Sequence, residues 1–189
     1  MKKIIVMVVS LVLVSGFAQL FAQQNTGSTA VILNHFAAKN FTAGAIPKAD
    51  LDLIIQAGIR APSAMNRQPW LFTVVQDQSL AKQLVPAVVD GNVLIVVSTK
   101  GDGKTNGSQI LDCALAVENI YLQAQALGYG SRIMTGPMDT LNSKFKTNLG
   151  LPAGYSAVAL VRVGKAQAPA DAVSAASARK NAADVVSYK

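Results

Sequence analysis

The residues of this sequence that best suit chemistry lie in the stretch APSAMNRQPW, residues 61–70. Ser63, Asn66 and Gln68 bring a hydroxyl and two amides to one short segment between two apolar runs. A flat heterocycle needs hydrogen bonds at its edge and stacking on its faces, and these side chains would supply the hydrogen bonds. The faces would meet an apolar wall formed by Pro69, Trp70 and Phe72. The simpler interpretation, favoured on composition alone, is a polar loop whose side chains bond to nearby backbone groups.

A second stretch, STKGDGKTNG at residues 98–107, lies between a predicted strand and a predicted helix. Its Gly103-Lys104-Thr105 matches the end of a phosphate-binding P-loop. The complete pattern also needs a glycine five positions before Gly103, where this chain has Ser98. Without that glycine the backbone cannot surround a phosphate in the usual way. We therefore interpret the stretch as a flexible polar surface loop, with a P-loop nucleotide hydrolase as the alternative.

Other catalytic groups are scarce in this sequence. His35 is its single histidine, and no group of cysteines or carboxylates at metal-ligand spacing accompanies it. A hydrolase triad would have to use His35, yet no G-x-S-x-G nucleophile elbow occurs. If the protein is an enzyme, we therefore expect a cofactor to carry the chemistry.

Length and composition fit one domain that is stabilised by a core or by a partner subunit. The chain has 189 residues and a formal net charge of +7. Beyond the first residues, its lysines are scattered from Lys39 to Lys189 without a basic block or interleaved aromatics, so the charge does not predict nucleic-acid binding. Cys113 is the single cysteine, which excludes an intramolecular disulfide.

The first residues have the build of an export signal. Two lysines precede a long apolar run, and small residues follow near Ala18 and Ala22. We expect residues 1–22 to be a cleaved signal peptide, 23–30 a disordered linker and 31–189 a single domain that is periplasmic or secreted, without stable membrane association. The alternative is a retained membrane anchor, because the run approaches the ~20 residues of a spanning helix.

Periodicity and breakers outline the elements that must position these residues. Proline and glycine delimit most of the helices, and runs of β-branched residues mark the strands. Asp139 and Gly150 are predicted to cap the last of the amphipathic helices. Helices are predicted over 31–38, 47–61, 79–85, 108–127 and 138–149, and strands over 70–75, 92–98, 155–163 and 184–188.

The longest predicted helix, 108–127, is apolar on two sides. One stripe consists of Cys113, Ala116, Val117, Ile120, Ala124 and Leu127, and a second of Leu111, Leu115 and Leu122. A helix that is apolar on two sides must be covered on both. We expect the sheet to cover one side and a second copy of the chain to cover the other.

Four segments in order resemble the nitroreductase family of FMN-dependent oxidoreductases. IRAPSAMNRQPWLFTVV resembles the flavin loop of the family, and DCALAVENIYLQAQALGYGS its long dimer-forming helix. LGLPAGYSAVALVRVG is similar to the following helix end and strand, and ARKNAADVVSY to the C-terminal flavin-phosphate segment. The resemblance covers nearly the whole chain after the predicted signal.

This resemblance implies an α+β fold, with a mixed, largely antiparallel sheet flanked by helices, in a homodimer that binds FMN at the subunit interface. It implies that Pro62, Ser63 and Asn66 line the flavin and that Gln68 supports their loop. Lys39 falls on a position that reaches the pyrimidine edge of the ring. The remaining positions carried over are Thr135 and Gly136, whose backbone faces the flavin, and Arg179, which binds the phosphate.

The sequence departs from the family pattern at its phosphate contacts. An Arg-Arg-Ser type triplet reads His35-Phe36-Ala37 here, and a basic residue near the C-terminus is Ser177, for which Lys180 is a substitute. Charge-assisted hydrogen bonds contribute about 1.5–3 kcal/mol each, so two losses predict much weaker FMN binding.

The reaction implied is ping-pong hydride transfer from a small-molecule donor, such as NAD(P)H, to a nitro-aromatic or a quinone. An exported enzyme would need another donor or a scavenged one. The alternative function is a non-catalytic binding module with a lost or altered FMN site.

Overall fold

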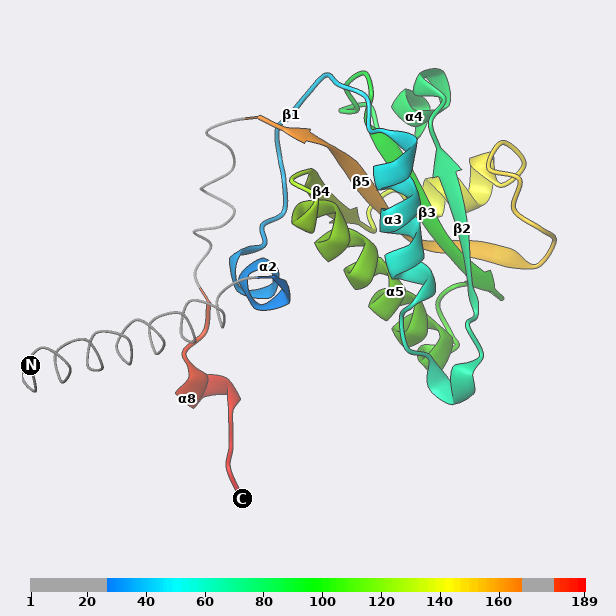
Figure 1. Ribbon diagram of the computed structural model, residues 1–189. Coiled ribbons are helices and arrows are strands. Elements are labelled where there is room, and N and C mark those ends of the chain that lie inside the picture. Colours follow the sequence, from blue (N-terminus) through cyan, green and yellow to red (C-terminus); the bar gives the residue numbers. More distant parts are fainter. Residues whose placement is uncertain (1–26, 168–178) are drawn as a thin grey trace, which may run out of the picture. The chain divides into compact units, whose positions relative to one another are not determined.

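The structure, a computed structural model, describes residues 27–167 and 179–189 (Figure 1). The predicted signal peptide, the first linker residues and Ser177 lie outside these ranges. The chain divides into two units, one that ends at His35 and one that starts at Phe36. Each is described by itself.

The first unit contributes helix α2, Ser28–Asn34. This helix begins three residues before the predicted start at residue 31 and ends four residues before residue 38, so residues 28–30, at the end of the predicted linker, are helical. Asn34 donates its side-chain amide to the carbonyl of Ala30 at 2.8 Å, and the His35 ring lies 2.6 Å from the carbonyl of Ile32. These side chains bond to carbonyls of the last turn, which helps the helix end there.

The second unit is built on a five-stranded sheet (Figure 1). Its order is β1-β5-β3-β2, and β4 also pairs with β5. Each of these strand pairs is antiparallel, and a single parallel bridge joins Ala37 to Ser131. The strands are β1 (Phe41–Thr42), β2 (Trp70–Val75), β3 (Val93–Lys100), β4 (Gly130–Met134) and β5 (Tyr155–Ala166).

Helices cover both faces of the sheet, which confirms the predicted α+β architecture. Helices α3 and α5 lie side by side on one face, as Figure 1 shows, and their residues share a core cluster with alternate residues of β3 and β5. We call this the α5 face. The helices of the unit are α3 (Lys48–Ile59), η1 (Ala64–Asn66), α4 (Gln78–Leu84), α5 (Gly107–Ala126), α6 (Met138–Thr140), η2 (Leu141–Phe145) and α8 (Ala182–Val185).

The opposite face carries α4 and the segment from α6 to Leu149, and we call it the α4 face. Leu94, Val96 and Leu160 point to this face, whereas their neighbours Ile95 and Val161 point to the α5 face. This alternation is what a two-sided buried strand requires, and it explains why β3 reads as a continuous apolar run.

Two predicted elements differ from those observed. Asp139 does not cap the helix that starts at Met138, because its carboxylate accepts a hydrogen bond from Lys104 at 2.9 Å. This helix also continues as the π-helical turn η2, where the Ser143 hydroxyl bonds to the carbonyls of Asp139 and Thr140. Side-chain bonding to carbonyls competes with regular helix geometry.

The C-terminal stretch 184–188, predicted as a strand, begins instead within helix α8. Two alanines open this helix, and a strand would need an edge to pair with. The short strands β1 and β4 were not predicted, because Gly130, Ser131 and Arg132 interrupt the apolar pattern of β4. Within the described residues, no helix is both long and apolar enough to cross a membrane.

Candidate functional site

The loop between α3 and β2 carries strained backbone. Met65, Asn66 and Gln68 have positive φ angles of 52°, 53° and 47°. Asparagine tolerates this left-handed region, but methionine and glutamine rarely enter it, and each such residue costs on the order of 1 kcal/mol or more. Strain of this kind persists where surrounding contacts fix it, and it gathers at binding sites.

Side chains of the loop itself supply part of that fixation. The Ser63 hydroxyl accepts a hydrogen bond from the Gln68 backbone N–H at 3.0 Å. The Gln68 side-chain amide donates to Asn66 Oδ1, also at 3.0 Å. Ser63 is half-buried, whereas Asn66 and Gln68 are exposed. The local bonding expected from composition is therefore present, and amide groups of the loop still face outward.

Asp112 on α5 anchors the loop to the helix and was missed by the sequence analysis. Its carboxylate accepts a hydrogen bond from the Ala64 backbone N–H at 2.9 Å, and the residue is only 4% exposed. A carboxylate on the buried side of an otherwise apolar helix needs such a partner. The signal for it was available, because Asp112 interrupts the apolar run next to Cys113.

The apolar wall predicted beside the loop belongs largely to the core. The rings of Trp70 and Phe72 are stacked, with centroids 6.3 Å apart and an interplanar angle of 12°. Both are partly buried against the core cluster of the α5 face. A surface cavity of about 400 Å³ lies beside the loop, lined by Gln56, Ile59, Arg60, Ala61, Asn66 and Gln68.

A second group of predicted site residues lies at the other end of α5. Exposed Lys39 follows Ala38, whose backbone N–H bonds to Ser131 at 2.9 Å. The neighbouring Phe36 exchanges two hydrogen bonds with the Gln125 side chain, each 3.0 Å long. Asp112 and Gln125 are 13 positions apart, so the points at which the strained loop and Phe36 are anchored to α5 lie about 20 Å apart along the helix axis.

Thr135 and Gly136 follow β4 and are exposed. Thr135 lines a cavity of about 220 Å³ together with Lys104 and Asp139, which form an ion pair 2.9 Å long. The Thr135 carbonyl accepts from the Met138 backbone N–H at 3.1 Å. A Cβ placed on Gly136 would have no residue other than its chain neighbours within 4 Å, so the backbone is open on that side.

The predicted phosphate contacts fall in separate parts of the chain. His35 is half-buried in the first unit, and Arg179 and Lys180 are exposed. Burial raises the pKa of the Tyr121 hydroxyl, and the positive charge of Arg179 opposes that rise. Arg179 therefore lies near the C-terminal half of α5, toward the same end as Lys39.

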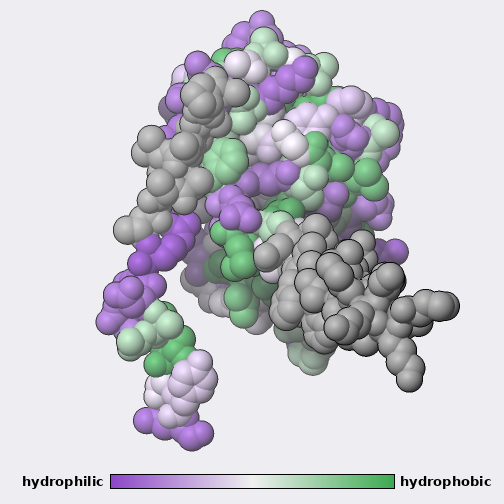
Figure 2. Space-filling model, turned by 60° about the vertical axis from the view of Figure 1, so that its left-hand side comes forward, coloured by the Kyte–Doolittle hydropathy of each residue, from purple (hydrophilic) through white to green (hydrophobic). Residues whose placement is uncertain are grey.

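Helix α5 keeps part of the two-sided character predicted from its sequence. Most of the first stripe is buried, with Cys113, Ala116, Ile120 and Ala124 at 0% exposure. On the second stripe, Leu111 is 62% exposed, whereas Leu122 is partly buried and packs against the core cluster of the α5 face. Figure 2 shows one face of the molecule, on which green hydrophobic residues lie among purple hydrophilic ones. An apolar side chain so exposed on a long helix is typical of a surface that meets another chain.

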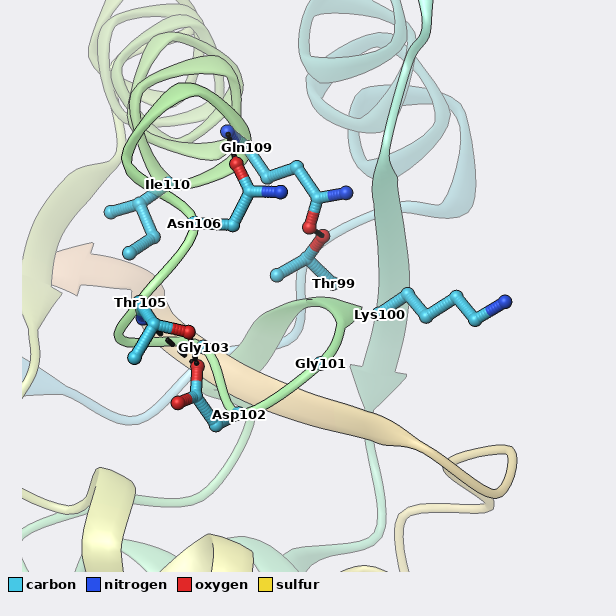
Figure 3. Close-up of a pocket in the computed structure, with 9 residues that line it drawn as sticks. All are labelled: Thr99, Lys100, Gly101, Asp102, Gly103, Thr105, Asn106, Gln109 and Ile110. Atoms are coloured by element: carbon cyan, nitrogen blue, oxygen red, sulfur yellow. Dashed lines mark hydrogen bonds between the residues drawn. The ribbon is translucent and has the colours of Figure 1, made fainter.

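The Gly103-Lys104-Thr105 stretch lies in the loop that Figure 3 shows. Asp102 accepts hydrogen bonds from the backbone N–H groups of Lys104 and Thr105, at 2.8 and 2.9 Å. These N–H groups are therefore already used, and the Lys104 ammonium is paired with Asp139. The loop borders a cavity of about 260 Å³, but it does not form the phosphate cradle of a P-loop.

Neither a metal nor a reactive thiol stands out. Within residues 27–167 and 179–189, no group of three or more histidines, cysteines or carboxylates lies close enough to hold a metal ion. Burial raises the pKa of the Cys113 thiol to about 11, so the thiolate is scarce at neutral pH.

Known proteins resemble this chain in sequence and in fold. The sequence pattern of the nitroreductase family matches residues 32–93 and 88–165. A protein of Archaeoglobus fulgidus, provisionally named an NADH dehydrogenase/NAD(P)H nitroreductase, is 33% identical over 129 residues, which covers 63% of this chain and 74% of the relative.

Two solved nitroreductases with bound FMN share the fold. The one from Bacteroides fragilis has a TM-score of 0.68 at 22% identity and covers 87% of this chain and 100% of its own. The one from Desulfitobacterium hafniense has a TM-score of 0.67 at 23% identity and covers 85% and 96%. These likenesses confirm the arrangement of sheet and helices predicted from the sequence.

Proposed function

The chain belongs to the nitroreductase family, and we propose that it is an FMN-dependent oxidoreductase. One observation carries the proposal: the segment with the sequence of the family's flavin loop is held in a strained, outward-facing conformation. Such strain is expected where a loop is pre-organised for a ligand. The A. fulgidus relative, named for an NAD(P)H reaction, supports the same chemistry.

The donor set of the chain fits FMN in part. The strained loop offers amides to a heterocycle edge, and Gly136 leaves room beside its backbone. Lys39 supplies a cation for the pyrimidine edge, and Arg179 and Lys180 supply cations for a phosphate. His35-Phe36-Ala37 stands where the family has cationic contacts, so the phosphate end is the weaker part of the fit.

Two copies of the chain are needed to complete this set. The loop is anchored near the N-terminal end of α5, and Phe36, three residues before Lys39, is anchored about 20 Å away toward the C-terminal end. In a two-fold dimer whose α5 helices pair antiparallel, the loop of one copy would approach Lys39 of the other. Exposed Leu111 provides apolar surface for that pairing. We therefore propose a homodimer with two shared sites.

When bound, FMN supplies two-electron transfer between an NAD(P)H-type donor and an electron-poor acceptor such as a nitro-aromatic or a quinone. The protein contributes binding and orientation, and the positive charge of Lys39 favours an anionic ring edge. Donor and acceptor would use the same open face in turn, which gives ping-pong kinetics. We also propose that the protein is exported and that it uses an electron donor available outside the cytoplasm.

The visible spectrum of the purified protein tests the proposal. A flavoenzyme is expected to be yellow or to take up added FMN, and a colourless chain that takes up none would contradict it. Arg179→Ala is expected to weaken FMN binding at least tenfold, because a charge-assisted hydrogen bond contributes about 1.5–3 kcal/mol. Lys100→Ala, which removes an exposed cation elsewhere, is the matched control.

The second candidate function is a non-catalytic binding module, and His35-Phe36-Ala37 is the observation that favours it. This protein would keep the fold and the dimer but hold FMN weakly or not at all. Turnover of a quinone or a nitro compound by the FMN-reconstituted dimer decides between the two. Robust turnover supports the enzyme, whereas a protein that shows no turnover, whether or not it takes up FMN, supports the binding module.

A further inference from the structure

Two arginines lie directly opposite each other on the α4 face of the sheet. Arg132 of β4 pairs with Arg162 of β5 in the antiparallel register, so their side chains leave the sheet on the same side. Arg162 is only 4% exposed and Arg132 is half-buried. Like charges placed opposite each other repel, and burial strengthens the repulsion.

Within the described residues, one N–H donor of the Arg162 guanidinium has a hydrogen-bond partner. Its Nε donates to Asn92 Oδ1 at 2.8 Å, and its Cζ lies 4.0 Å from the centre of the Phe41 ring. In the described ranges of the chain, no carboxylate pairs with either arginine, since the ion pairs there are Lys48–Asp52, Lys82–Asp90 and Lys104–Asp139. A buried charge without a counter-charge is costly.

The surroundings hold Arg162 in place. Asn92 is fully buried, and its Nδ2 has no hydrogen-bond partner. Gly164 makes room for this amide, because a Cβ at that position would collide with Nδ2. Asn92 and Phe41 thus fix the guanidinium, while an amide N–H next to it stays unsatisfied. Burial, together with the charge of Arg132, lowers the pKa of Arg162 to about 10, so the group is still charged at neutral pH.

We propose that Arg132 and Arg162 form a binding site for a small dianionic oxyanion, with inorganic phosphate as its simplest example. A guanidinium presents its N–H groups in a planar fork that matches paired oxygens, and two forks offer two positive charges. A dianion neutralises both charges, whereas a monocarboxylate leaves one of them unpaired. This site lies on the opposite face of the sheet from α5 and is independent of the proposed flavin site.

Phosphate titration of the full chain, saturated with FMN, tests this site. Inorganic phosphate is expected to raise the thermal unfolding midpoint above that in sodium chloride of the same ionic strength, and calorimetry gives its Kd. In Arg132→Gln the Kd is expected to weaken at least tenfold and the added stability to disappear. Arg132 is chosen because it is half-buried, whereas replacing Arg162 removes a packed side chain.

Two controls separate this site from other cations. Lys100→Gln makes the same charge change at an exposed position and should leave the phosphate Kd unchanged. Arg179→Gln alters the predicted flavin-phosphate contact and should also leave it unchanged, whether or not FMN binds. Acetate should bind more weakly than phosphate. A phosphate Kd that is equal in the wild type and Arg132→Gln, or no phosphate binding at all, would overturn the proposal.

Discussion

Two polar loops lie near the start of α5, and they differ in how they accommodate left-handed backbone. The loop at residues 62–68 places Met65, Asn66 and Gln68 at positive φ, whereas the loop at 101–106 does so at Gly101 and Gly103. Glycine adopts this conformation at little cost, but a side chain does not. The first loop therefore stores strain that the second avoids.

Hydrogen bonding separates the same two loops. In the loop at 101–106, the Asp102 carboxylate accepts hydrogen bonds from the backbone N–H groups of Lys104 and Thr105, so these two N–H groups are not available to a ligand. In the loop at 62–68, a buried carboxylate from another element, Asp112, holds the backbone at Ala64. A ligand loop is thus better recognised by strain and external anchoring than by polar composition, which both loops share.

The largest expected effect comes from the external anchor. Asp112→Ala leaves the Ala64 N–H without its partner, and losing a hydrogen bond to a charged group costs about 1.5–3 kcal/mol of unfolding free energy. FMN affinity should fall at least tenfold as the loop loses its position. Urea unfolding and FMN titration measure the two effects. Asp112→Asn keeps an oxygen acceptor and should lose less, and an unchanged Asp112→Ala would show that the loop holds itself.

Removing one hydroxyl from each loop should have smaller effects on stability and FMN affinity, and the two variants form a matched pair. Ser63→Ala deletes the acceptor of the Gln68 N–H and should cost about 1 kcal/mol. It should also weaken FMN binding several-fold. Thr105→Ala deletes a hydroxyl that bonds only within its own loop, to Asp102 at 3.1 Å. FMN titration should show no change for Thr105→Ala, and equal losses in both variants would remove the distinction between the loops.

Periodicity predicted the parts of the fold that burial dictates. Strand 70–75 was predicted with its observed bounds, and helix α5 begins and ends within one residue of the prediction. The buried stripe of α5 follows directly from apolar spacing. Short elements whose position depends on contacts with distant segments were missed or mistaken, as with β4 and the stretch 184–188.

The sequence predicted which residues belong to the candidate site, but it did not predict how they are arranged in space. The sequence singled out Ser63, Asn66 and Gln68, and the resemblance assigned them a role. Neither signal could reveal the left-handed backbone or the bond between Ala64 and Asp112, because that bond spans 48 positions. The roles of these residues toward FMN stay predictions.

Two substitutions exchange the backbone requirements of the loops, one placing glycine in the loop at 62–68 and the other removing it from the loop at 101–106. Met65 is 75% exposed, so Met65→Gly loses little packing and relieves strain, with an expected gain of about 0.5–1 kcal/mol. Gly103→Ala introduces strain at φ 71° and places a Cβ 3.0 Å from Val158 Cγ1, so it should cost about 1 kcal/mol. Urea unfolding measures both. A loss of stability in Met65→Gly would mean that the methionine side chain, and not the strain, matters there.

Acidification should affect the loops differently, although its expected effect is the smallest. Backbone hydrogen bonds from Lys104 and Thr105 lower the pKa of Asp102 below its ordinary value of 3.8. The stabilisation from this carboxylate is therefore fully present above pH 3.8 and is lost as the pH falls through the lower folded value. In the loop at 62–68, the Ser63–Gln68 bond joins uncharged groups and has no such pH dependence, although the Asp112 carboxylate also anchors that loop at Ala64.

Backbone amide shifts followed by NMR from pH 6 downward test this contrast while the fold persists. The amides of Lys104 and Thr105 should titrate together with a midpoint below 3.8, because both donate to the same carboxylate oxygen. The Gln68 amide should not follow that titration, and Asp102→Asn should abolish it. A midpoint at or above 3.8 would show that the Asp102 carboxylate does not hold the loop at 101–106. The contrast between that loop and the loop at 62–68, which Asp112 anchors from outside, would then fail.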